Sequence, residues 1–403
     1  MPWRERSVMA EREEFARLAL LGGANKRRLC QRFEIDPSTG HKWLGRYRKE
    51  GRSGLCDRSR RPHHCPSRTD GATEAEVLRI RDNSNNAWGA RKIARVMERE
   101  GSGKVPALST ITEILRRHGR LDERKHEHPG PLTRFEREQP NELWQMDFKG
   151  HFAVGRGRCH PLTVLDDHSR YALGLQACGD EQDKTVRERL SALFRCYGLP
   201  FAMLMDNGSP WGDTGSGYTM FGVWLMRLGV KVSHGKPFHP QTQGKDERFH
   251  RTLKAEVLHG RSFDDIAHCQ RAFDEWRNIY NCERPHEALG LETPITRYHP
   301  SHRSFPGHLP DIAYWPGDAV RKVDSDGFIS FKNRSLRIGK AFRRQPVALR
   351  ATDADGVFDV IFCTQEIGQI DLRQLSACGF VDVATAMPTT PQAQQQNHSK
   401  ISS

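Results

Sequence analysis

Apolar residues near the start of the chain recur every three or four positions, which is the spacing of one helical face. This spacing predicts a first helix that buries Phe15, Leu18 and Ala19, and a second, short helix over residues 25–33. Both helices are too short to be stable alone, so we expect them to pack against a third.

The third predicted helix covers residues 38–51. Asp36 suits its N-cap and Pro37 its first turn, because the cap accepts a backbone N–H and proline lacks one there. The inward side chains are predicted to be Trp43, Leu44 and Tyr47, and the outward ones His41, Lys42, Arg46, Arg48 and Lys49. Three short helices with a basic last one favour a helix-turn-helix DNA-binding unit over a small bundle with a solvated basic face.

A second helical unit is predicted over residues 73–119. Its helices are expected over residues 76–82, 88–100 and 109–119, and Gly119 ends the last one as a C-cap glycine would. The middle helix carries apolar residues at helical spacing, namely Ile93, Val96 and Met97. This order indicates a second helix-turn-helix unit, and two in tandem would cover a longer DNA site than one.

From residue 141 the pattern changes to short apolar runs, which are typical of strands. One run carries Asp147, and two runs within residues 160–178 are joined by turn residues 166–169 into a hairpin. There follow a helix over 181–197, a strand that ends at Asp206, a helix over 218–228, a strand over 230–233 and a helix that begins near Gly244. Strands followed by alternating helices and strands indicate a mixed α/β sheet.

Alternation of apolar and polar residues returns towards the C-terminus, between residues 311 and 380. It predicts five short strands, over residues 318–323, 327–331, 335–339, 346–352 and 356–362, and we expect them to form a small β-barrel. The tail from residue 385 is rich in Gln, Thr and Ser and is predicted to be disordered.

The charge of the chain indicates the kind of molecule that it binds. The 403 residues include 63 Lys and Arg against 50 Asp and Glu, and residues 1–61 alone hold 16 against 8. Such an excess favours a nucleic acid partner. Residues 51–64 are rich in Gly, Arg and Pro and predict a linker that could follow DNA phosphates, through Arg52, Arg58, Arg60 and Arg61.

Other composition features exclude several protein classes. No run of about 18 apolar residues predicts a membrane span, and the N-terminus lacks the apolar core of a signal peptide. Ten cysteines without a Cys-x-x-Cys pair indicate reduced thiols, and we expect a cytoplasmic, nucleoid-associated protein. The spacing of Cys56, His63, His64 and Cys65 fits no common zinc site.

Three acids lie on separate predicted elements of the α/β region. Asp206 follows Asp147 by 59 positions, and Glu247 follows Asp206 by 41. Carboxylates that converge in this way could hold Mg²⁺ or Mn²⁺, and two such ions about 4 Å apart clamp a phosphate for in-line displacement. In the helix that holds Glu247, Phe249, Leu253 and Val257 are predicted to face the core, and the opposite flank to carry Glu247, His250, Arg251 and Lys254.

Plainer interpretations compete with this one. Asp206 opens an Asp-Asn-Gly sequence, which is ordinary turn chemistry. Asp246 is a rival ligand beside Glu247, although an acid in the first turn also suits the helix dipole. Asp166 and Asp167 are expected to serve the hairpin turn. Two nearby histidines could contact DNA or be structural, His239 and His250.

Five sequence blocks appear in a fixed order. They are WQMDFKG (144–150), LTVLDDHSRYALG (162–174), DNGSPWG (206–212), HPQTQGKDERFHRTLK (239–254) and YNCERPHEALGLETP (280–294). Together they resemble the catalytic core of insertion-sequence transposases related to retroviral integrases, the ribonuclease H-like "DDE" enzymes. The chain departs from the family pattern at Gln243, where asparagine is common, and at Asp246, where an apolar residue is usual.

The resemblance implies a ribonuclease H-like core in which Asp147, Asp206 and Glu247 hold two Mg²⁺ or Mn²⁺ ions and Lys254 holds the DNA end. The resemblance favours Glu247 over Asp246 as the third metal ligand, because Arg248 follows Glu247 and Lys254 lies downstream, as in the family pattern. It further implies cleavage and strand transfer on double-stranded DNA by at least a dimer, and a C-terminal barrel that binds DNA. A DNA-binding regulator, an inactive remnant and a nuclease that only hydrolyses are the alternatives.

The expected chain is therefore multidomain. Its predicted parts are a helix-turn-helix domain with a basic linker (1–61), a second such domain (62–120), a linker (121–140), the catalytic core (141–300), a small β-barrel (311–380) and a disordered tail (385–403).

Overall fold

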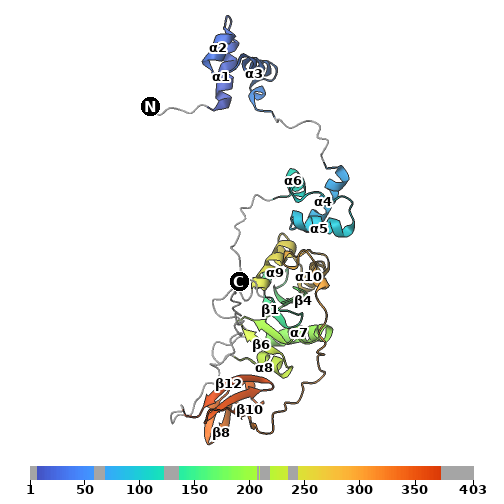
Figure 1. Ribbon diagram of the computed structural model, residues 1–403, viewed down its shortest axis with the longest axis vertical. Coiled ribbons are helices and arrows are strands. Elements are labelled where there is room, and N and C mark those ends of the chain that lie inside the picture. The colour runs from blue at the N-terminus through green and yellow to red at the C-terminus, as the bar shows by residue number, and fades with distance from the viewer. Residues whose placement is uncertain are drawn as a thin grey trace, which may run out of the picture. The chain divides into compact units, whose positions relative to one another are not determined.

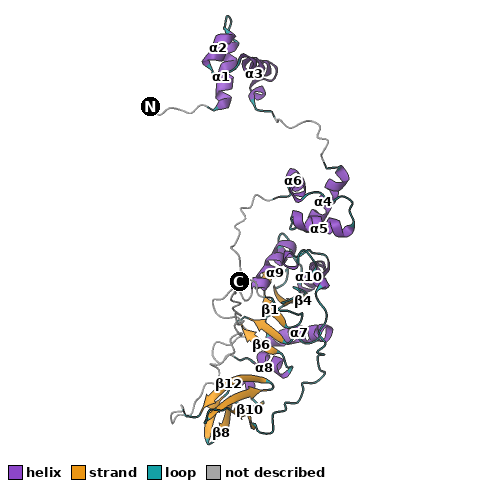
Figure 2. Cartoon of the chain, in the orientation of Figure 1, coloured by secondary structure: helices purple, strands orange, loops and turns teal. Residues whose placement is uncertain are grey.

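The computed structural model describes residues 7–58, 69–121, 136–206, 208, 218–234 and 244–373. The chain divides into two compact units, residues 1–68 and residues 69–403 (Figure 1). The first unit is helical, and the second combines helices with two groups of strands (Figure 2). No helix within the described ranges has both the length and the apolar character that a membrane span requires.

Three helices and a short 3-10 helix make up the first unit: α1 (Val8–Ala19), α2 (Lys26–Arg32), α3 (Pro37–Glu50) and η1 (Gly51–Leu55). As predicted, the Asp36 side chain caps α3 by accepting the backbone N–H of Ser38. Gly40 lies where α3 crosses the other helices, and a Cβ there would come within 2.5 Å of the Cys30 Sγ and 2.9 Å of the Phe15 ring. The close packing of these helices therefore requires glycine at this position.

The second unit begins with another group of three helices: α4 (Gly71–Asn83), α5 (Ala90–Glu100) and α6 (Leu108–Arg117). α4 is longer at both ends than predicted, and it starts earlier because the Asp70 side chain caps it by accepting the N–H of Thr73. The predicted apolar residues Ile93, Val96 and Met97 are buried between the helices. Gly119 has a φ of +65°, the left-handed conformation that suits a glycine after a helix.

A mixed sheet follows these helices. Its strands are β1 (Leu143–Phe148), β2 (Phe152–Ala153), β3 (Arg158–Asp166), β4 (Ala172–Cys178), β5 (Ala202–Met205) and β6 (Lys231–His234). β3 lies antiparallel between β4 and β1, whereas β5 pairs in parallel with both β1 and β6. The sheet therefore agrees with the predicted mixed α/β core, although the two-residue strand β2 was not predicted.

Helices pack against both faces of this sheet: α7 (Asp183–Tyr197), α8 (Met220–Arg227), α9 (Gly244–Leu253) and α10 (Ile266–Cys282). Successive side chains of a strand point to opposite faces. On β1, Trp144 and Met146 pack in the cluster that holds the apolar residues of α7 and α8. Leu175 of β4 belongs to a second cluster with Phe249 of α9 and Phe273 of α10.

The C-terminal strands differ from the predicted five-stranded barrel. The structure has six of them: β7 (Ala319–Lys322), β8 (Phe328–Phe331), β9 (Arg334–Arg337), β10 (Pro346–Ala351), β11 (Val357–Phe362) and β12 (Gln365–Asp371). They form a four-stranded sheet in the order β12-β11-β10-β7 and a separate β8–β9 hairpin. No strand pairing among the described residues closes these sheets, so a C-terminal β-sheet domain is present but the barrel is not confirmed.

Polar contacts join α5 and the preceding turn to the sheet-bearing part of the second unit. An Arg95 nitrogen lies 2.5 Å from a Glu292 carboxylate oxygen, and Arg99 donates to the Glu283 carbonyl at 2.9 Å. Asn85 donates to the carbonyl of Glu256. Arginines of α5 therefore contact one carboxylate and one backbone carbonyl of the sheet-bearing part.

Candidate active site

Two of the three predicted acids lie at the same level of neighbouring parallel strands. β1 and β5 pair with Gln145 opposite Leu204, and Asp147 and Asp206 each lie two residues beyond that pair. Asp206 directly follows the last residue of β5, and its carboxylate accepts the backbone N–H of Gly208 at 3.0 Å. The carboxyl ends of parallel strands thus bring both acids to one edge of the sheet.

The third predicted acid, Glu247, lies in the first turn of α9 and is exposed. Its carboxylate is close enough to Asp147 for the two charges to interact. The pKa of Asp147 is raised to about 7, first by burial and then by the negative charges of Asp206, Glu181 and Glu247. The described residues nevertheless contain no group of three His, Cys, Asp or Glu side chains already arranged to hold an ion. The acids are therefore close enough for their charges to interact, without forming a finished metal site.

The rival acid Asp246 points the other way. Its side chain is 1% exposed, and its Oδ1 has no hydrogen-bond partner among the described residues. Burial raises its pKa well above the usual range, and the charges of Asp147 and Asp167 add to this effect. On α9, then, Asp246 faces inward and Glu247 outward, and the choice of Glu247 as the third ligand stays a prediction.

Asp166 and Asp167 lie where the hairpin between β3 and β4 turns. Asp166 accepts the backbone N–H groups of Asn141 at 2.7 Å and Ser169 at 2.8 Å. Asp167 accepts the Gln145 amide at 2.7 Å and forms an ion pair with Lys245 of α9. These contacts match the structural role expected from the sequence, and they tie the turn to β1 and α9.

One predicted orientation on α9 is wrong. His250 was expected on the outward flank with Glu247, but it packs against the sheet. Its Nε2 lies 2.9 Å from the Thr163 hydroxyl, and its Nδ1 lies 3.9 Å from an Asp147 carboxylate oxygen. Burial and, to a smaller extent, the charge of Lys149 lower its pKa to about 4. His250 is therefore held neutral beside Asp147, whereas His239 lies outside the described residues.

Two lysines lie near the acids. Lys254 is exposed on the π-helical turn Lys254–Leu258 that continues α9. Lys149 follows β1 by one residue, and its pKa is lowered by burial and by the charge of Lys254. The two ammonium groups are thus close to each other at the Asp147 end of the sheet. Lys149 was missed in the sequence, where only its place two residues after Asp147 hinted at a role.

The predicted basic residues of the first unit have different surroundings. On α3, His41, Lys42 and Arg48 are exposed, whereas Arg46 is half-buried. The Arg46 guanidinium lies 5.0 Å and the Lys42 ammonium 5.1 Å from the centre of the Trp43 ring. Arg52 pairs with Glu13 at 3.2 Å and Arg58 pairs with Glu50, while Arg60 and Arg61 lie outside the described residues. Only some of these side chains are therefore free of an internal acidic partner.

A small groove between α2 and α3 adds basic residues that the sequence did not single out. It has a volume of about 340 Å³, and its walls include Lys26, Arg27 and His41. The exposed side of this helix pair therefore carries positive charge from both helices.

Known protein families match most of the chain in an ordered series. A helix-turn-helix domain matches residues 11–63, and a homeodomain-like domain matches residues 39–115. Integrase core domains match residues 137–240 and 228–294. The C-terminal domain of IS481 family transposases matches residues 318–377.

Relatives of this chain include proteins of bacterial insertion elements. The chain is 26% identical to a 31.7 kDa protein of insertion element IS407 from Burkholderia multivorans, over 59% of this chain and 85% of that protein. It is 24% identical to the transposase of insertion sequence IS629 from Shigella sonnei, over 66% of this chain and 88% of that protein. A 115-residue stretch is 35% identical to part of the Gag-Pro-Pol polyprotein of squirrel monkey retrovirus. The match covers 28% of this chain and 6% of that polyprotein.

Among solved structures, the magnesium complex of the HTLV-2 integrase catalytic core covers 40% of this chain and 99% of its own, with 15% identity and a TM-score of 0.31. The catalytic core of BIV integrase covers 39% and 92%, with 23% identity and a TM-score of 0.29. Because these TM-scores are low, the likeness of this chain to known proteins rests on the sequence matches. In order along one chain, the protein therefore contains regions that match helix-turn-helix domains, an integrase core and an IS481-type C-terminal domain, and its relatives include insertion-sequence transposases.

Proposed function

We propose that this chain binds the ends of its insertion element and catalyses cleavage and strand transfer of DNA through Asp147, Asp206 and Glu247. The observation that carries the proposal is the position of Asp147 and Asp206 at the same level of two neighbouring parallel strands. In agreement with this geometry, burial and the charges of Asp206, Glu181 and Glu247 raise the pKa of Asp147. Negative charge gathered in this way is unfavourable alone and is relieved by a cation.

The donor set suits a hard divalent cation. All three candidate ligands are carboxylates, which favour Mg²⁺ or Mn²⁺ over softer ions. We propose that Asp147, Asp206 and Glu247 would hold two such ions. When bound, the ions would polarise the scissile phosphate and lower the pKa of the attacking hydroxyl or water.

The chain's own groups have supporting roles in this proposal. Thr163 forms a hydrogen bond with His250 of α9, and its hydroxyl also donates to the Asp147 carbonyl of β1 at 2.9 Å. These two contacts fix the position of β1 against α9. Lys149 and Lys254 attract the phosphates of the DNA end, since both are cationic and near the acids. Water first cleaves one strand, and the freed 3′-hydroxyl then attacks a phosphodiester of the target, with no covalent enzyme intermediate.

DNA recognition is assigned to the helix-turn-helix units and the basic linker. The exposed residues of α3 would face the groove, and Arg52, Arg58, Arg60 and Arg61 would follow the backbone. Arg52 and Arg58 would exchange their acidic partners for phosphates. The C-terminal domain, predicted as a small barrel, would provide further DNA contact. Two element ends must be joined in one event, so we expect at least a dimer on DNA.

A strand-joining assay tests the proposal. Purified full-length protein is incubated with Mg²⁺, supercoiled target DNA and a precut element end that bears a 3′-hydroxyl. Joined product that requires both the metal and the 3′-hydroxyl supports a transposase. Hydrolysis without joining would favour a plain nuclease, and DNA binding without either reaction would favour a regulator or an inactive remnant.

A further inference from the structure

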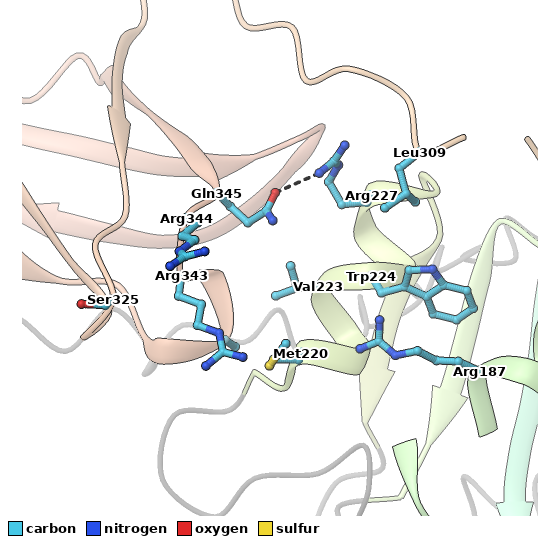
Figure 3. A pocket seen from close by; sticks show the side chains of 11 residues that line it. Arg187, Met220, Val223, Trp224, Arg227, Leu309, Ser325, Arg343, Arg344 and Gln345 are labelled. Carbon is cyan, nitrogen blue, oxygen red and sulfur yellow. Dashed lines mark hydrogen bonds between the residues drawn. The ribbon is translucent and has the colours of Figure 1, made fainter. Parts of the chain in front are cut away.

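A groove of about 540 Å³ lies between the integrase core and the C-terminal domain (Figure 3), and none of the three acids lines it. One wall is formed by α8, with Arg187 of α7 beside it. The other wall is formed by the turn that precedes β10, which holds Arg343 and Arg344. The groove is therefore a composite of two domains and belongs to neither alone.

The charge of this groove is uniformly positive. None of its 11 lining residues is Asp or Glu. Four of them are arginines, namely Arg187, Arg227, Arg343 and Arg344. Arg227 donates to the Gln345 side chain at 2.9 Å and to the Pro310 carbonyl at 2.8 Å, both neutral acceptors. Of the four, Arg187 has an acidic partner, Asp183 at 2.9 Å. The positive charge of the groove is therefore largely uncompensated.

Unused hydrogen-bonding capacity points to a ligand. The Nε of Arg227 is buried and has no hydrogen-bond partner among the described residues. Arg343 and Arg344 are exposed, and their guanidinium groups make no hydrogen bond or ion pair with any described side chain. Arg344 adopts a φ of +63°, a conformation that costs energy for a residue with a Cβ. The strained turn directs two consecutive arginines to the groove side (Figure 3).

The two walls are held together by a packed core. Phe342 is fully buried beside the ring of Tyr218, with ring centres 5.2 Å apart. The Tyr218 hydroxyl donates to the Ile367 carbonyl at 3.1 Å, and Gln365 donates to the Val230 carbonyl at 3.1 Å. Because apolar residues of both domains share one cluster, the spacing of the two walls that carry the arginines is set before any ligand arrives.

We propose that this groove binds the phosphodiester backbone of DNA, as a contact separate from the acids. Arginine offers several N–H donors in a planar fork that matches phosphate oxygens. Four arginines along one groove suit several phosphates better than a single small anion. Trp224 and Met220, the latter 48% exposed, add apolar surface for a sugar or base. The inference rests on the proposed function because it takes DNA as the substrate.

The test compares two double variants of the full-length chain. Arg343→Ala with Arg344→Ala removes the two exposed groove charges. Lys322→Ala with Arg337→Ala removes two exposed charges of the same domain that do not line the groove. Binding to a labelled random-sequence duplex is measured at several salt concentrations, and thermal melting checks that both variants fold.

Losing two phosphate contacts should lower the slope of log affinity against log salt by about 2, and the loss of affinity between about 50 and 200 mM salt should shrink roughly tenfold. The control pair should keep the wild-type slope. Equal slopes for both pairs would overturn the groove proposal while leaving DNA binding intact. A wild-type chain that does not bind DNA would overturn the proposed function as well. Direct binding of inorganic triphosphate to the wild type but not to the Arg343/Arg344 double variant, together with equal salt slopes for the duplex, would mean a small-anion site instead.

Discussion

At the residue scale, burial sets the protonation of side chains around the core. His286, in the block of residues 280–294, is 6% exposed, and its Nε2 lies 3.1 Å from the Tyr280 carbonyl. Burial lowers its pKa to about 3, and the charge of Arg284 contributes. Such a histidine stays neutral in the folded chain at pH values where it is charged in the unfolded chain.

This difference predicts a pH-dependent stability. Because the folded pKa of His286 lies below the unfolded value of about 6.5, the unfolded chain takes up the proton first, and stability falls as pH drops from about 6.5 towards 3. His286→Gln should remove roughly 1 kcal/mol of the stability loss between about pH 7.5 and 5.5. Urea unfolding at both pH values measures it. If the variant shows the same pH dependence as the wild type, His286 is not the group responsible.

Residue identity was easier to predict than side-chain direction. The sequence placed Asp147, Asp206 and Glu247 on the correct elements, because strand ends and helix starts follow from apolar periodicity. It placed His250 on the wrong side of α9, since position 250 borders the buried face and the hydroxyl of Thr163, 87 residues away, draws the ring inward. Contacts between distant residues of this kind leave no trace in local spacing.

At the element scale, the packing of the first three helices depends on one position. Gly40→Ala would place a methyl group within 2.5 Å of Cys30 Sγ and 2.9 Å of the Phe15 ring, so we expect α3 to separate from α1 and α2. Hydrogen exchange of the full chain should show reduced protection in these helices. Gly45→Ala is the matched control, because its Cβ would meet nothing within 4 Å, and it should protect α3 by helix propensity. Equal protection in the two variants would refute this packing argument.

The same scale shows why the C-terminal domain was only partly predicted. Five of its strands follow from alternation. β12 was missed because its buried residues, Ile367 and Ile370, are three positions apart rather than two, and its partner β11 has a register shift between Val360 and Ile361. Whether strands close into a barrel depends on pairing between distant segments, which alternation does not encode.

At the scale of the whole molecule, the basic face of α5 is used for contact within the chain. Arg95 pairs with Glu292 across the junction between the second helical group and the integrase core. Exposed ion pairs of this kind contribute little individually, so we expect a small coupling. In a double-mutant cycle, Arg95→Glu and Glu292→Arg should each reduce hydrogen-exchange protection of α5, and the charge-swapped double variant should recover part of it. Additive losses would show that the pair does not couple the two parts.

The central claim is that three acids from β1, β5 and α9 act as one catalytic site. The most direct test is the strand-joining assay on Asp147→Asn, Asp206→Asn, Glu247→Gln and, as the matched control on α9, Asp246→Asn. We predict that the first three variants lose at least about two orders of magnitude in joining while binding element-end DNA normally. Asp246→Asn should retain joining. Joining by Glu247→Gln, together with its loss in Asp246→Asn, would contradict the assignment of the third ligand, and joining by Asp147→Asn would contradict the site itself.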